Sequence, residues 1–348
     1  MDVLPIGAIA ALIGLTTGVV MGLAARLGDF CTLGAIESAI YGEDQRRIRM
    51  WGIVLATAIF STFFLSTAGL IELEATIYHS VAWNPLASIV GGAVFGYGMA
   101  LAGNCGFGAL ARFGGGDLRA MVVVVVMAIT GFVTLNGPLA KLRVLAFPQT
   151  PSEGPQGFAH LVAGQLGLPP LAFATLVAAA LLIWALSYAP LRASVRQVTW
   201  GVAAGLSVSF ALWGTSMLHG LSFGEIPVEG HSFTAPLGRT LLWLMTASSG
   251  GLGFAVGSVA GVLAGAFVGS TIKGHFRWEA CEDPRELGRQ VGGAALMGVG
   301  GIVAMGCSVG QGVTGFATLA YSAPVTLAAI YFGAVFGLRR LIQGYQPD

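Results

Sequence analysis

Long apolar stretches separated by short polar segments dominate the chain. A helix that crosses a membrane needs about 20 mostly apolar residues. The seventh apolar stretch, 238–271, is too long for one straight span. It forms either one tilted helix or a short helix at 238–248 followed by a full helix across 250–270. The pattern predicts an all-α polytopic membrane protein with about nine transmembrane helices. Their expected positions are 3–26, 48–70, 85–103, 118–136, 168–188, 197–215, 238–271, 287–305 and 322–340.

Composition supports a membrane protein and argues against other classes. Hydrophobic residues make up 55% of the 348 residues and charged residues only 9%, whereas soluble proteins carry about 25% charged residues. The 53 glycines suit helices that approach one another closely in a bilayer. A net charge of +1 gives no sign of nucleic-acid binding. The N-terminal stretch lacks a basic region and its apolar run is too long for a signal peptide, so we expect no cleavable signal.

The positions of the basic residues predict the orientation. With nine spans and the N-terminus outside, all 17 Lys and Arg residues except Lys141, Arg143 and Arg239 fall on one face. Because positive charge concentrates on the cytoplasmic side, we expect an outer N-terminus and a cytoplasmic C-terminus. Counting the seventh stretch as two spans would scramble this alternation, which favours nine.

The second half repeats the first in weak form. Residues 1–348 are expected to form a single transmembrane domain, with repeat 1 at about 1–136, a connector with its own helix at about 137–190, and repeat 2 at about 191–348. Because the connector contributes one span, the second repeat is inverted, which is typical of transporters. Each repeat adds short segments, which we expect to be re-entrant helices. These four segments lie at about 28–41, 104–116, 219–231 and 306–320.

Three of the four cysteines open a CxxG motif, as Cys31 with Gly34, Cys105 with Gly108, and Cys307 with Gly310. A short helix that begins there would present free N–H groups and its positive end to an anion. A thiol is a weak donor and a polarisable acceptor, so it suits an anion that carries sulfur. The alternative is that each cysteine is only a small buried hydrophobe.

Other cysteine chemistry is not indicated. The chain has no CxxC pair, so we expect neither a disulfide framework nor a metal site, and no cofactor. Cys281 lies in a charged loop outside the pattern and is expected to be a surface thiol without a role.

Polar neighbours of the motifs are further candidates. Asn104 and Gln311 flank the cysteine turns and either donate hydrogen bonds to a ligand or cap the broken helices. Arg112 either draws anions into a vestibule or only sets the orientation. A loop with two histidines and two glutamates has no familiar ligand spacing, so a solvated loop is expected there rather than a metal site. Its members are His219, Glu225, Glu229 and His231.

The early CTLG, then AGNCGFGALARFGGG, then MGCSVGQGVTGFATLA resemble the YeeE/YedE sulfur-transport family of bacterial inner-membrane proteins, over nearly the whole chain. The resemblance implies nine membrane helices plus four short ones in an inverted, hourglass-shaped repeat. It implies thiosulfate uptake, with Cys31, Cys105 and Cys307 relaying the ion by thiol hydrogen bonds. It also implies a small TusA-like sulfur-carrier protein as a partner on the cytoplasmic side.

Three alternatives stay open. A membrane thiol oxidoreductase needs paired cysteines, and here the cysteines belong to separate segments, although a persulfide relay between them is conceivable. In a passive small-anion channel the cysteines would serve only as packing. A third alternative is a transporter of another sulfur or selenium species. No phosphate-binding loop for ATP is present, so a gradient or consumption of the ion would drive transport.

Overall fold

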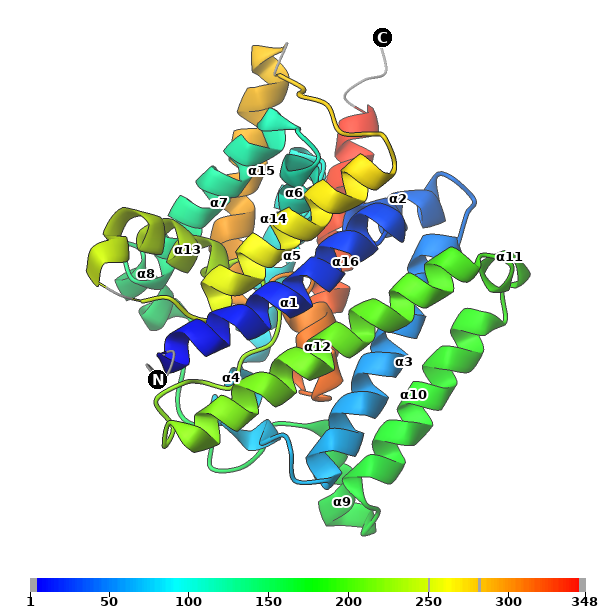
Figure 1. Cartoon of the computed structure of the whole chain (residues 1–348), viewed down its shortest axis with the longest axis vertical. Coiled ribbons are helices and arrows are strands. Elements are labelled where there is room, and N and C mark those ends of the chain that lie inside the picture. Colours follow the sequence, from blue (N-terminus) through cyan, green and yellow to red (C-terminus); the bar gives the residue numbers. More distant parts are fainter. Residues whose placement is uncertain (1–4, 250, 281–282, 344–348) are drawn as a thin grey trace.

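The computed structural model describes residues 5–249, 251–280 and 283–343, so Cys281 lies outside the described residues. Within these ranges the chain is a bundle of helices (Figure 1). The long ones are α1 Ile6–Leu27, α3 Arg46–Thr67, α5 Pro85–Ala102, α7 Leu118–Leu135, α10 Pro170–Leu186, α12 Val195–Leu221, α14 Phe254–Ile272, α15 Pro284–Val303 and α16 Ser322–Gln343. The short connecting helices are η1 Leu73–Ala75, α4 Ile77–Ser80, α8 Ala140–Ala146, α9 Phe158–Leu166 and α11 Ala189–Arg192.

The apolar helices confirm a polytopic all-α membrane fold. In the described part of the chain, 7 helical segments are long and apolar enough to cross a membrane. Helix α10 is apolar but has only 17 residues, and the glycine-rich α15 is more polar. The count of nine spans therefore stays a prediction.

The seventh apolar stretch is two helices rather than one. Helix α13 (Ala235–Thr246) is followed by a 3-10 turn η2 (Ala247–Ser249) and then by α14, so the single tilted helix is wrong. The 12 residues of α13 reach only about 18 Å at the helical rise of about 1.5 Å per residue, too short to cross a bilayer. The split therefore leaves the predicted alternation of charge intact.

Two of the four short segments are helices that begin at a cysteine, namely α2 (Thr32–Ile40) and α6 (Gly106–Gly114). A third contains the π-helical turn η3 (Gly310–Gly315). The prediction of a short helix at 219–231 is wrong. Helix α12 continues to Leu221, and no helix follows until α13 begins at Ala235.

Individual residues of the 219–231 segment explain why no separate helix forms there. Phe223 and Gly224 adopt positive φ angles of 52° and 89°, and Pro227 lacks the N–H that a helix interior needs. The short helix of the second half is α13, further along the chain. Its N-cap residue is Thr234, which therefore takes the place that Cys31 has at α2.

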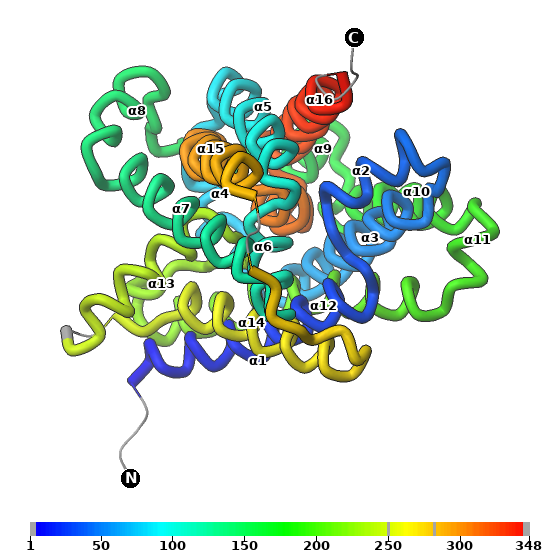
Figure 2. The backbone as a smooth tube through the Cα atoms, turned by 90° about the horizontal axis from the view of Figure 1, so that it is seen from above, coloured from blue at the N-terminus to red at the C-terminus, as the bar shows by residue number. Residues whose placement is uncertain are grey.

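Helices of the two halves pack in exchanged pairs. Helix α1 lies along α14, and α12 lies along α3; likewise α5 lies along α16, and α15 along α7. Figure 1 shows α1 in blue and α14 in yellow side by side. An inverted repeat predicts such exchanges. Figure 2 shows α6 near the middle of the molecule, between the group of α5, α15 and α16 and the group of α1 and α14.

Glycine makes the closest of these contacts possible. A Cβ atom on Gly257 of α14 would lie 1.9 Å from the Ala11 carbonyl oxygen, and one on Gly22 of α1 would lie 2.4 Å from the Val262 carbonyl oxygen. The two backbones therefore meet directly, which is how small residues hold membrane helices together.

Candidate functional site

In two of the three CxxG motifs the cysteine sulfur accepts a backbone N–H in the way that a capping oxygen usually does. Cys105 is the N-cap residue of α6, and the Gly108 N–H donates to its Sγ at 3.3 Å. The Gly310 N–H donates to Cys307 Sγ at the same distance. Cys31 is the N-cap residue of α2 without such a side-chain bond. Sequence spacing thus fixes each thiol at the start of a short segment.

The three cysteine segments meet in the interior. Cys105 and Cys307 are fully buried, and Cys31 is partly buried. Thr32 Oγ1, one residue after Cys31, donates to Ser308 Oγ at 3.0 Å and lies 3.9 Å from Cys105 Sγ. Ser308 in turn directly follows Cys307. Thr32, Ser308 and Cys105 therefore form one group of hydroxyls and a thiol, and Cys31 and Cys307 are direct chain neighbours of two of its members.

Two further polar contacts reach Cys307 from the segment before α13. Ser232 Oγ lies 3.9 Å from Cys307 Sγ, and the Phe233 N–H donates to the same sulfur at 3.2 Å. Cys307 Sγ therefore accepts two backbone N–H groups, from Gly310 and from Phe233. The S–H group of Cys307 is therefore available to donate a hydrogen bond to another group.

The space beside Gly108 is shared by two thiols. A Cβ atom added there would lie 3.6 Å from Cys105 Sγ and 3.8 Å from Cys31 Sγ. The absence of a side chain at Gly108 thus leaves both sulfurs facing one point. Aromatic rings surround this region, with ring centroids 5.9 Å apart for Phe30 and Phe107 and 5.3 Å apart for Phe107 and Phe233.

A cavity of about 320 Å³ opens beside Ser232 on the predicted outer side. Tyr78, Glu229 and Arg239 also line it. The Tyr78 hydroxyl donates to the Gly310 carbonyl oxygen at 2.8 Å, and Arg239 pairs with Glu229 at 2.6 Å. Cys307 is therefore the cysteine nearest to this outer cavity.

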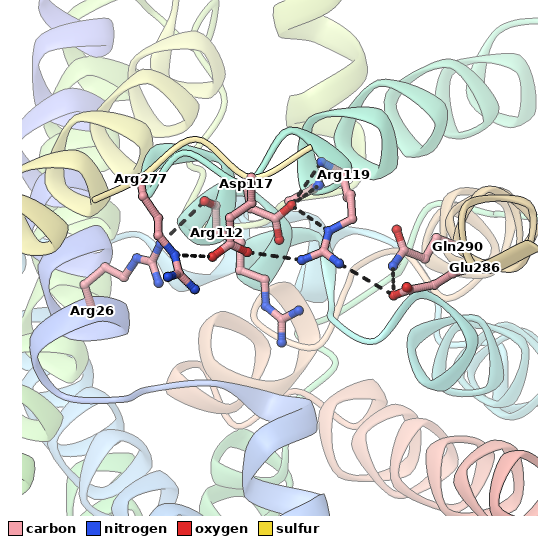
Figure 3. Close-up of polar contacts among 9 residues, drawn as sticks. Arg26, Arg112, Asp117, Arg119, Arg277, Glu286 and Gln290 are labelled. Atoms are coloured by element: carbon pink, nitrogen blue, oxygen red, sulfur yellow. Dashed lines mark hydrogen bonds and ion pairs between the residues drawn. The ribbon is translucent and has the colours of Figure 1, made fainter. Parts of the chain in front are cut away.

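Basic residues lie at the opposite end, near Cys31. The Arg47 Nη1 atom is 2.7 Å from the position of a Cβ on Gly34. Arg26 donates from Nη2 to the Arg112 carbonyl oxygen at 3.4 Å. Figure 3 shows the Arg112 guanidinium pointing away from the neighbouring carboxylates, and the residue is exposed.

Arg119 makes different contacts from Arg112. It contacts Asp117 at 3.2 Å, Glu279 at 3.2 Å and Glu286 at 4.0 Å (Figure 3). The Leu118 N–H donates to the Glu279 carbonyl oxygen at 3.0 Å. These contacts fix the turn between α6 and α7 against the segment that precedes α15.

The two predicted amide residues differ in their contacts. Gln311 is buried, donates from Nε2 to the Ala304 carbonyl oxygen at 2.8 Å and accepts from Ser322 Oγ at 3.0 Å. Because Ala304 is the C-cap residue of α15, these bonds favour capping. Asn104 is buried directly before Cys105, and its Oδ1 has no hydrogen-bond partner.

The loop with two histidines is not uniformly solvated. His231 is fully buried, with Nδ1 2.7 Å from Ser258 Oγ, while His219 Nδ1 lies 2.6 Å from the Ile226 carbonyl oxygen. Within the described residues, no group of three or more His, Cys, Asp or Glu side chains could hold a metal ion.

Sequence reasoning missed the hydroxyls of the site. Thr32 and Ser308 each follow a predicted cysteine directly, and that adjacency is the signal that could have identified them. Ser232 and Thr234 lie beside a segment whose fold was mispredicted, so no local signal marked them.

In the described residues, apolar helices enclose buried thiols and hydroxyls between charged groups at either end, which is the arrangement of a multi-pass membrane transporter. The family described as sulphur transport matches residues 27–336, and the chain belongs to this family. A protein from Spirochaeta thermophila named thiosulfate transporter TsuA is 28% identical over 92% of this chain and 94% of its own length. The Escherichia coli protein of the same name is 24% identical over 92% and 91%.

Proposed function

We propose that the protein takes up thiosulfate through a path lined by Cys307, Cys105 and Cys31, in that order from the outside. The observation that carries this proposal is the buried group of Thr32, Ser308 and Cys105, two of whose members directly follow Cys31 and Cys307 in the chain. Two relatives named thiosulfate transporters, similar over almost their whole length, support the choice of ion.

The thiols act as weak donors in succession. Thiosulfate presents a negative terminal sulfur and three oxygens, and a neutral thiol donates S–H to either kind of atom. Backbone N–H groups already occupy the acceptor side of Cys105 and Cys307. A thiolate would repel the dianion, and burial in apolar surroundings disfavours the thiolate. Weak bonds at several places let the ion move on, as conduction requires.

Charge guides the ion at both ends. Arg239 lines the outer cavity, and Arg47 and Arg112 lie near Cys31. In this orientation the N-terminus is outside the bacterial inner membrane and the C-terminus is cytoplasmic. The inner mouth beside Cys31 is where a small TusA-like sulfur carrier would receive the ion. The inverted repeats at about 1–136 and 191–348 then meet at the path.

Growth on thiosulfate tests the function directly. A bacterium that lacks its own sulfate and thiosulfate importers is supplied with thiosulfate as the sole sulfur source. Wild type and Cys281→Ala should restore growth, whereas Cys31→Ala, Cys105→Ala and Cys307→Ala should not. Absence of growth with the wild-type protein at confirmed expression would refute thiosulfate as the substrate.

A further inference from the structure

A small cavity near Cys307 adjoins the outer cavity and shares Ser232 and Arg239 with it. Its volume is about 110 Å³, and α8, α13 and α15 contribute to its walls. The polar residues that line it are Arg143, Gln149, Ser232, Thr234 and Arg239. No acidic side chain lines it. The charged residues of this lining, Arg143 and Arg239, are both positive, which suits an anion.

Two buried polar atoms of this lining have no partner. Thr234 is 1% exposed, and its Oγ1 makes no hydrogen bond. Although Thr234 is the N-cap residue of the 12-residue helix α13, its side chain makes no capping bond. The Arg143 Nε is likewise buried without a partner. Unpartnered buried polar groups are rare and costly, so both groups indicate a ligand.

Arg239 is the second positive charge beside this cavity, and a carboxylate of the same chain pairs with it. It pairs with Glu229 at 2.6 Å, and its side chain is 48% exposed. Arg143 donates from Nη1 only to the neutral Gln149, at 3.1 Å. Two guanidinium groups and the positive end of α13 therefore face a cavity that adjoins Ser232, the neighbour of Cys307.

We propose that this cavity is an outer binding site for a tetrahedral divalent oxyanion, held by Arg143, Thr234 and Arg239 before the ion reaches Cys307. The inference rests on the proposed uptake of thiosulfate. Glu229 holds Arg239 while the site is empty and is displaced by the ion. Since all donors here are N–H and O–H groups, the site binds sulfate as well as thiosulfate. Selection for the sulfur-bearing ion then occurs at the thiols that follow.

Uptake of radiolabelled thiosulfate into proteoliposomes, measured over a range of concentrations, tests this site. Arg143→Ala and Arg239→Ala should each raise the half-saturating concentration by about tenfold or more, because bonds to charged groups are the strong ones. Thr234→Val should raise it less. Glu229→Gln should lower it, because the competing carboxylate is gone. Lys141→Ala is the matched control, a basic residue of α8 that does not line the cavity, and should leave it unchanged.

Sulfate provides the second readout. It should inhibit thiosulfate uptake competitively, and calorimetry should detect its binding to purified Cys307→Ala but not to Arg143→Ala/Arg239→Ala. Arg239→Lys should retain part of the affinity, which excludes simple misfolding. Uptake by the double variant with a wild-type half-saturating concentration would overturn the inference and leave the proposed function standing. Failure of the wild-type protein to transport would refute the function, while sulfate binding would still test the site.

Discussion

Replacing Gly108 with alanine separates the stability of α6 from passage of the ion. The added methyl group would lie 3.6 Å from Cys105 Sγ, 3.8 Å from Cys31 Sγ and 3.5 Å from Asn104 Cβ. These are ordinary van der Waals distances, so the residue fits without displacing its neighbours. Alanine inside a helix should raise the free energy of unfolding by about 0.5–1 kcal/mol relative to glycine.

The same methyl group obstructs the path. Non-bonded heavy atoms approach to about 3.5–4 Å, so no atom of the ion can occupy the point that both sulfurs face. We expect thiosulfate uptake into proteoliposomes to fall by at least about tenfold, equivalent to about 1.4 kcal/mol on the barrier. The melting temperature should stay the same or rise.

Gly292→Ala is the control for this effect. Gly292 lies in α15, and a Cβ atom there would meet nothing within 4 Å, so it gives the same entropic gain with no expected effect on uptake. Wild-type uptake by a stable Gly108→Ala protein would show that the ion does not pass between Cys31 and Cys105.

Three further results are expected. Gly261→Val should lower the free energy of unfolding by about 2 kcal/mol or more, because even a Cβ atom there would lie 2.3 Å from the Leu15 carbonyl oxygen; an unchanged thermal melt would contradict the close contact of α1 with α14. Thr32→Val should cost about 1 kcal/mol and slow uptake because it breaks the bond to Ser308, whereas Thr32→Ser should restore both; equal uptake by the two variants would exclude the hydroxyl from the path. Arg119→Ala should change the free energy of unfolding by less than about 1 kcal/mol, since its ion pairs are partly exposed, but should make the segment before α15 easier to cleave in limited proteolysis; unchanged cleavage would show that these ion pairs do not fix the turn.

The local sequence predicts much of the fold. The lengths of the apolar stretches located the long helices. The CxxG spacing placed Cys105 at the start of α6, because the capping contact between Cys105 and Gly108 is local. Hydrophobicity left the seventh stretch open between one tilted helix and the observed split, and it gave no sign of the loop around Phe223, because both depend on turn geometry. The bond of Thr32 to Ser308 joins residues that only tertiary packing brings together.

The contacts of the charged residues could not be predicted from the local sequence either. Sequence placed Arg112 and Arg119 on the same face, since both follow the positive-inside rule. Only their neighbours in space distinguish them, because Arg119 meets carboxylates from the segment before α15 and from α15 itself, whereas Arg112 points away from these carboxylates (Figure 3).

The relay of the ion by neutral thiols requires a hydrogen-bond donor at Cys105, so replacement of this residue distinguishes the relay from covalent sulfur transfer. Initial rates of radiolabelled thiosulfate uptake would be compared for wild type, Cys105→Ser, Cys105→Ala and the control Cys281→Ala in proteoliposomes. Serine keeps a donor but cannot form a persulfide, so we predict partial uptake with serine, almost none with alanine and full uptake with the control. Complete loss with both serine and alanine would contradict the hydrogen-bond relay in favour of covalent sulfur transfer, and full uptake with both would leave Cys105 as packing.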